Sequence, residues 1–134
     1  MAKIIDIEGI GPAYAKKLVD AGISTTGRLL KDAASAAGRK DLAARADVTT
    51  KQVLEWVNRA DLMRIKGVGT QYSDLLEASG VDSVVELARR NAENLFAAMT
   101  DVNAAKKLVR QVPSVAQVRD WVAQAADLPR VVTH

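Results

Sequence analysis

Several residue types that carry chemistry in other proteins are missing or scarce in this chain of 134 residues. Cysteine is absent, which excludes disulfide bonds and thiolate metal sites and fits a reducing compartment. The only histidine is the last residue, and no nucleophile elbow, P-loop or zinc-protease motif is present. We therefore expect a protein that is not an enzyme, with no catalytic residues, no metal site and no cofactor.

Long apolar runs are also absent, and residues 95–99 form one of the longest. A membrane-spanning helix needs about 20 apolar residues, and the N-terminus has no basic stretch followed by an apolar one. We therefore expect a cytoplasmic protein that does not bind a membrane.

Aromatic residues make up only 4% of the chain, and no stretch alternates β-branched with polar residues. No strand is predicted, and the expected fold class is all-α.

One short pattern occurs twice: apolar, any residue, glycine, apolar, glycine. It covers residues 7–11 and again residues 65–69. Flanking residues match at the same spacing of 58 positions, as the following pairs show: Gly9 and Gly67, Gly11 and Gly69, Tyr14 and Tyr72, Leu18 and Leu76, Gly22 and Gly80. A single such pattern carries little information, but two copies with matched flanks indicate an internal duplication.

Each copy of the pattern predicts a tight turn followed by a helix. Glycine tolerates positive φ, and the apolar residue between the glycines, Ile10 or Val68, can pack inward and fix the turn. Pro12 suits the first position of a helix, because its missing N–H would have no partner there. Gly22 and Gly80 stand where a glycine commonly ends a helix.

Residues 7–18 and 65–76 resemble the helix-hairpin-helix motif of sequence-independent DNA-binding proteins. The whole chain resembles an uncharacterised family of small bacterial proteins with two such motifs. The resemblance implies an all-α, SAM-like helical fold of two pseudo-symmetric halves. We expect one compact domain over residues 1–134, with an internal repeat of residues 1–65 and 66–134. In the motif, backbone N–H groups of the hairpin and the following helix hold a DNA phosphate.

The charge distribution favours the first copy as the better phosphate site. The net charge is +3, and residues 1–66 contain twelve Lys or Arg and eight Asp or Glu, whereas residues 67–134 contain seven and eight. We expect weak, sequence-independent DNA binding, opposed by nearby acids such as Glu8, Asp74 and Glu77. The predicted DNA-binding residues are Gly9, Ile10, Gly11, Lys16 and Lys17 in the first copy, and Lys66, Gly67, Val68, Gly69 and Thr70 in the second.

Other functions stay open. A protein–protein interaction adaptor would use the same helices, and the sequence names neither its partner nor the oligomeric state. Residues 42–56 resemble the helix-turn-helix of bacterial repressors, which would direct Thr50, Lys51, Gln52 and Glu55 to the major groove. Asp47 replaces the usual glycine of that motif, and we favour a core role for its apolar residues. Some helix-hairpin-helix turns also bind a monovalent cation, which this sequence does not decide.

The expected helices cover residues 12–21, 25–37, 40–46, 50–61, 70–79, 82–90, 91–112 with a break near 100, and 114–126. The last helix resembles the helix that precedes the second glycine pattern, since Trp121 matches Trp56. The first glycine pattern has no room for an entry helix before it. We therefore expect the last helix to pack beside the first pattern.

Two clusters of basic residues are expected to be solvated, with a phosphate track as the alternative. They are Arg39, Lys40 and Arg45, and Lys106, Lys107 and Arg110.

Overall fold

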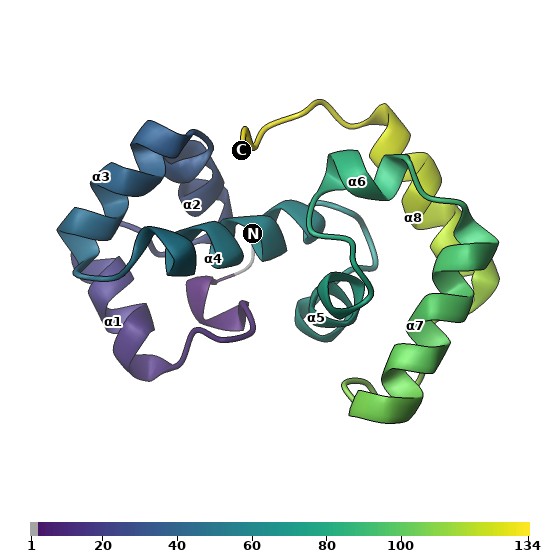
Figure 1. Ribbon diagram of the computed structural model, residues 1–134. Coiled ribbons are helices and arrows are strands. Elements are labelled where there is room, and N and C mark those ends of the chain that lie inside the picture. Colours follow the sequence, from purple (N-terminus) through teal and green to yellow (C-terminus); the bar gives the residue numbers. More distant parts are fainter. Residues whose placement is uncertain (1–2) are drawn as a thin grey trace. The chain divides into compact units, whose positions relative to one another are not determined.

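The computed structural model describes residues 3–134 of the chain, which are all-helical (Figure 1). The elements are η1 (Ile4–Asp6), a 3₁₀ helix, followed by α1 (Pro12–Asp20), α2 (Thr26–Ala33), α3 (Ala36–Ala46), α4 (Thr50–Leu62), α5 (Thr70–Ala78), α6 (Val84–Ala88), α7 (Ala92–Lys106) and α8 (Val115–Asp127). Residues 3–134 contain no strand, and Lys3 and Thr25 form one isolated bridge.

The chain divides into two compact units. Unit 1 extends to Asp61 and includes the last residues, Val131–His134, and unit 2 is Leu62–Arg130. The predicted repeat boundary, between residues 65 and 66, lies slightly later in the sequence. The prediction of one compact domain over residues 1–134 is not tested by this division and stays a prediction.

Unit 1 is built from η1 and α1 to α4 around an aliphatic core that includes Ile7, Leu18, Leu29, Leu42 and Val57, all at most 1% exposed. The C-terminal residues close this unit. Val132 is buried, and the Thr133 N–H donates to the Ala34 carbonyl at 2.8 Å. Residues distant in sequence thus complete one core.

Unit 2 contains α5 to α8. Helix α8 packs on α6 and α7, and α5 packs on α7. A capping box starts α8, in which the Ser114 hydroxyl accepts from the Gln117 N–H while the Gln117 side chain accepts from the Ser114 N–H. Arg119 on α8 donates to Glu93 on α7 at 2.7 Å, and this bond lowers the pKa of the Glu93 carboxyl.

The predicted helix over residues 25–37 is wrong in its extent, because two helices share that region. Helix α2 ends at Ala33, and Ser35 starts α3 by accepting the Gly38 N–H at 3.0 Å. Gly38 lies inside α3, and a Cβ there would collide with the Asp32 carbonyl oxygen. This glycine permits a close approach between the end of α2 and the first turn of α3, and it does not end a helix.

The predicted helix over residues 91–112 is shorter in the structure, and the expected break near residue 100 does not occur. Helix α7 continues unbroken to Lys106, and Lys107 takes the left-handed conformation with φ of 53°. The Asn103 side chain donates to the Val109 carbonyl and accepts from its N–H, at 3.1 and 2.9 Å. These bonds hold the chain after α7 in a turn and end the helix.

The prediction that the last helix packs beside the first glycine pattern is wrong. Helix α8 belongs to unit 2, and its Trp121 lies against Gly67 and Tyr72. The first glycine pattern is packed by Trp56 of α4 instead. Each glycine turn is therefore closed by the fourth α-helix that follows it in the chain, and the likeness of the two tryptophan segments marks these closing helices.

This pairing predicts which part of the molecule each tryptophan stabilises. We expect Trp121→Ala to lower the free energy of unfolding of unit 2 by about 3–5 kcal/mol, because a large core side chain is removed. Trp56→Ala is the matched variant and should affect unit 1. Amide chemical shifts during urea titration locate each effect. If Trp121→Ala perturbed the amide signals of residues 7–11 and left those of residues 65–69 unchanged, α8 would pack beside the first glycine pattern after all.

Candidate functional site

We name the first glycine pattern glycine turn 1 (residues 7–11); its first four residues form a hydrogen-bonded turn. The Ile10 N–H donates to the Ile7 carbonyl at 3.1 Å, and Gly9 has φ of 89°. Positive φ at the third position of such a turn is the reason for glycine there. Ile10 is buried at 4% exposure, while Gly9 and Gly11 are exposed. The predicted inward packing of Ile10 is confirmed.

Glycine turn 2 (residues 65–69) repeats this geometry. The Val68 N–H donates to the Ile65 carbonyl at 3.1 Å, Gly67 has φ of 96°, and Val68 is buried. Helix α8 holds this turn by a further pair of bonds. The Gln124 side chain accepts from the Lys66 N–H at 2.9 Å and donates to the Lys66 carbonyl at 3.1 Å. The backbone of turn 2 is therefore held by its own hydrogen bond and by the Gln124 side chain of α8.

A tyrosine and a tryptophan pack behind each turn. The ring centroids of Tyr14 and Trp56 are 5.3 Å apart with planes tilted by 56°, and those of Tyr72 and Trp121 are 5.3 Å apart with a tilt of 52°. Both tryptophans are almost fully buried. Tilted pairs at this distance are a favourable packing geometry. Tyr14 of α1 thus packs against α4, and Tyr72 of α5 packs against α8.

The helices that follow the two turns differ from the other helices at their first residues. Gly11 and Gly69 are the N-caps of α1 and α5, with extended backbone, and no cap side chain accepts a hydrogen bond from either helix. In each of the other six α-helices a cap side chain accepts from the first turn; these caps are Thr25, Ser35, Thr49, Ser83, Asn91 and Ser114. The first turns of α1 and α5 thus lack the cap side-chain acceptor that all other α-helices of residues 3–134 have.

The two predicted lysines of the first site have different surroundings. Lys16 forms an ion pair with Asp20 at 3.2 Å, but both side chains are mostly exposed, so this pair is weak. Lys17 donates to the Asp47 carbonyl at 3.1 Å and lies 5.9 Å from the centre of the Tyr14 ring. Lys17 therefore connects α1 to the turn between α3 and α4, a contact that the sequence reasoning missed.

Around glycine turn 2, Lys66 is exposed, and its ammonium has no ion-pair partner among residues 3–134. Thr70 is the first residue of α5 and is half-buried. The acids Asp74 and Glu77 lie further along the same helix and are also half-buried. The structure thus brings the five predicted residues of the second copy together at one helix start.

Residues 42–56, which resemble a helix-turn-helix, have a left-handed residue between α3 and α4. Asp47 has φ of 56° and takes the place of the usual glycine. Leu42 and Val53 are fully buried, which confirms their core role. The Gln52 side chain, expected in the major groove, instead donates to the Tyr14 hydroxyl at 2.9 Å and accepts from Thr49. Gln52 therefore holds α4 against α1.

Two kinds of feature are absent from residues 3–134. Over residues 3–134, no helix combines the length and the apolar character that crossing a bilayer demands. Within the same range, no three His, Cys, Asp or Glu side chains cluster in a way that could hold a metal ion.

The glycines of turn 2 provide a matched test of the geometry. We expect Gly67→Ala to destabilise the protein by about 1–3 kcal/mol, because φ is positive and the new Cβ would lie 3.0 Å from the Trp121 indole nitrogen. Gly69→Ala is the control, since its Cβ meets nothing within 4 Å. Urea denaturation measures both variants. Equal midpoints would show that Gly67 is not a strained position.

Comparison with known proteins gives a family but no activity. Residues 8–128 match the model of a domain of unknown function, DUF4332, and the matched range includes all eight α-helices, glycine turn 2 and all of glycine turn 1 except its first residue. No curated protein and no solved structure matched the chain. The match covers most of the chain, so the chain belongs to the DUF4332 family.

Proposed function

We propose that the protein binds the phosphate backbone of duplex DNA without reading its sequence. In this proposal each glycine turn and its following helix form a phosphate site of the helix-hairpin-helix type, and the chain consists of two pseudo-symmetric repeats of that plan. The observation that carries the proposal is the glycine cap of α1 and α5, which offers the first turn of each helix no cap side chain as an acceptor.

An anion suits these positions for two reasons. The N-terminus of a helix has free N–H donors and the positive end of the helix dipole. The glycines at Gly11 and Gly69 are exposed and present no side chain, so a phosphate could approach the backbone closely. Ser, Thr or Asn at the same positions would satisfy the donors internally, as they do in the other helices.

Charge supports turn 1 as the stronger site. Lys16 lies on α1, its side chain is 80% exposed, and its weak pair with Asp20 leaves the ammonium accessible. Lys17 contributes less than the sequence suggested, because it is bound to Asp47. Exposed Glu8 beside the turn opposes a phosphate, which fits weak binding.

The proposal is tested by changing only the cap. We expect Gly11→Asp to lower the affinity for a short random-sequence duplex about tenfold at low salt. The aspartate carboxylate would accept hydrogen bonds from the first-turn N–H groups of α1, and its negative charge would repel a phosphate. The fold should be retained, since φ of −82° at Gly11 suits any residue and a Cβ there has open space. Fluorescence anisotropy measures affinity and thermal unfolding measures stability.

Gly11→Ala is the matched control, because it adds a Cβ but no acceptor. We expect it to bind duplex as the wild type does, with affinity that is independent of sequence and falls with salt. Gly11→Ser should lie between the alanine and aspartate variants. Equal affinity of Gly11→Asp and Gly11→Ala would contradict the proposal, as would absence of duplex binding by the wild type at low salt.

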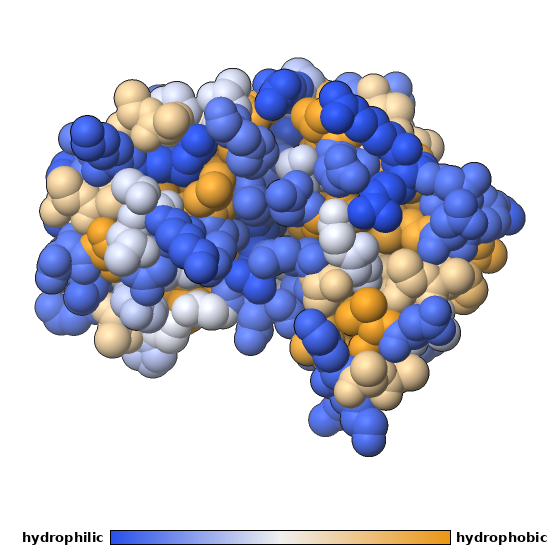
Figure 2. All heavy atoms as spheres, in the orientation of Figure 1, coloured by the Kyte–Doolittle hydropathy of each residue, from blue (hydrophilic) through white to orange (hydrophobic). Residues whose placement is uncertain are grey.

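A protein-interaction adaptor is the second candidate function, favoured by apolar surface. A groove of about 490 Å³ between η1 and α1 in unit 1 has largely apolar walls, and Ile5 and Val19 beside it are 46% and 51% exposed. Figure 2 also shows hydrophobic residues over α5 and α7 in unit 2. Exposed apolar areas of this kind are typical of docking surfaces. This function would be preferred if the wild type binds no duplex.

A further inference from the structure

A second groove in unit 1 lies between α3 and α4, away from the glycine-turn residues. Its volume is about 550 Å³, and it is lined by Ala36, Arg39, Lys40, Thr50, Lys51 and Leu54. Three of these six residues are basic and none is acidic. Its two walls are the first half of α3 and the first half of α4.

Arg39 places a charge inside unit 1 without a carboxylate to balance it. The residue is only 6% exposed, and burial lowers the pKa of its guanidinium. The guanidinium donates to three backbone carbonyls, those of Ala33, Ala34 and Thr133, at 3.2, 2.9 and 2.7 Å. No carboxylate of residues 3–134 forms an ion pair with it. Carbonyl dipoles stabilise this guanidinium, but no negative charge neutralises it. Arg39 therefore contributes a positive potential at the groove.

Lys40 and Lys51 add two further charges at the same groove. Both are exposed, and neither ammonium has a carboxylate partner in the part of the chain that the structure describes. Asp41, the neighbour of Lys40, is instead bound by Arg45 at 2.9 Å.

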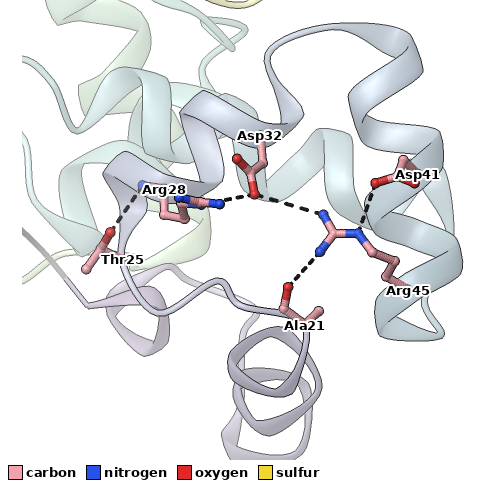
Figure 3. Close-up of polar contacts among 6 residues, drawn as sticks. All are labelled: Ala21, Thr25, Arg28, Asp32, Asp41 and Arg45. Atoms are coloured by element: carbon pink, nitrogen blue, oxygen red, sulfur yellow. Dashed lines mark hydrogen bonds and ion pairs between the residues drawn. The ribbon is translucent and has the colours of Figure 1, made fainter.

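Several other cations of unit 1 pair with acids or carbonyls of the same unit. Arg45 also lies 3.9 Å from Asp32 and donates to the Ala21 carbonyl, and Arg28 donates to Asp32 at 3.1 Å (Figure 3). Lys16 and Lys17 pair with acids as described above. Lys3 and Lys31 also lack an acidic partner among residues 3–134, but neither lines this groove, where Arg39, Lys40 and Lys51 come together.

We propose that the groove between α3 and α4 is a phosphate-binding site for a strand with closely spaced phosphates. Three positive charges around one groove call for a ligand with several negative charges close together, as consecutive phosphates provide. The Thr50 hydroxyl adds a donor, and Ala36 and Leu54 add an apolar wall against which a sugar can pack. The ligand is a nucleic-acid backbone or a free polyphosphate, which share this chemistry.

This site is separate from the glycine turns, so it stands or falls independently of the proposed function. The test compares Lys40→Gln/Lys51→Gln with the control Lys31→Gln/Lys106→Gln in the full chain. All four lysines are exposed and lack an acidic partner among residues 3–134, and both variants remove two charges. The probes are a short random-sequence duplex, sodium tripolyphosphate and poly-glutamate.

We expect the groove variant to bind tripolyphosphate about tenfold more weakly than the control. For duplex, the slope of the logarithm of affinity against the logarithm of salt should fall by about 2, one for each lost phosphate contact. In the wild type, tripolyphosphate should shift the amide signals of Thr50 and Lys51 more than those of Gly9 and Gly11.

The outcomes separate the two sources and the two proposals. Loss of tripolyphosphate binding with duplex binding unchanged supports the groove with a free polyphosphate as ligand. The same loss in a protein that binds no duplex supports the groove while the proposed function fails. If the two variants bind duplex equally well and also bind tripolyphosphate equally well, the proposal of a phosphate site in the groove is wrong. Binding of poly-glutamate as tight as tripolyphosphate also overturns it, because any polyanion would then suffice.

Discussion

The packing of one tryptophan behind each glycine turn is the contact on which the rest of the structure depends. Trp56 lies behind Gly9 in unit 1, and Trp121 lies behind Gly67 in unit 2. A side chain at these glycines would strain the turn, because φ is positive and, at Gly67, a Cβ would press on the indole. Each tryptophan thereby fixes the turn, and with it the position and direction of the helix that starts there.

A fixed turn also explains how a helix start can remain open. Most helices of this protein use a Ser, Thr or Asn side chain to satisfy their first N–H groups, which stabilises a helix by about 1 kcal/mol. Helices α1 and α5 start without that bond and are held by the packing behind their turns instead. In the function that we propose, the stability lost at the cap leaves donors available to a phosphate, in the way that functional positions often depart from the most stable choice.

Local features of the fold were predictable from the sequence because they depend on residues a few positions apart. Positive φ at Gly9, inward packing of Ile10 and the start of α1 at Pro12 all follow from five consecutive residues. Where prediction failed locally, a contact across the end of a helix was responsible. Gly38 lies within a helix because the Asp32 carbonyl approaches it, and α7 ends early because Asn103 binds the backbone of Val109.

The sequence by itself determined an all-helical chain, the two turns and the residues that face their cores. Only the tertiary structure decided which helix closes each turn, because α4 and α8 have similar apolar faces and the sequence does not state which turn each will meet. The same holds for the charged side chains. Lys17 is bound to the carbonyl of Asp47, and Arg39 reaches Thr133 near the end of the chain. A side chain's partner is set by three-dimensional packing, which brings together residues that no local pattern connects.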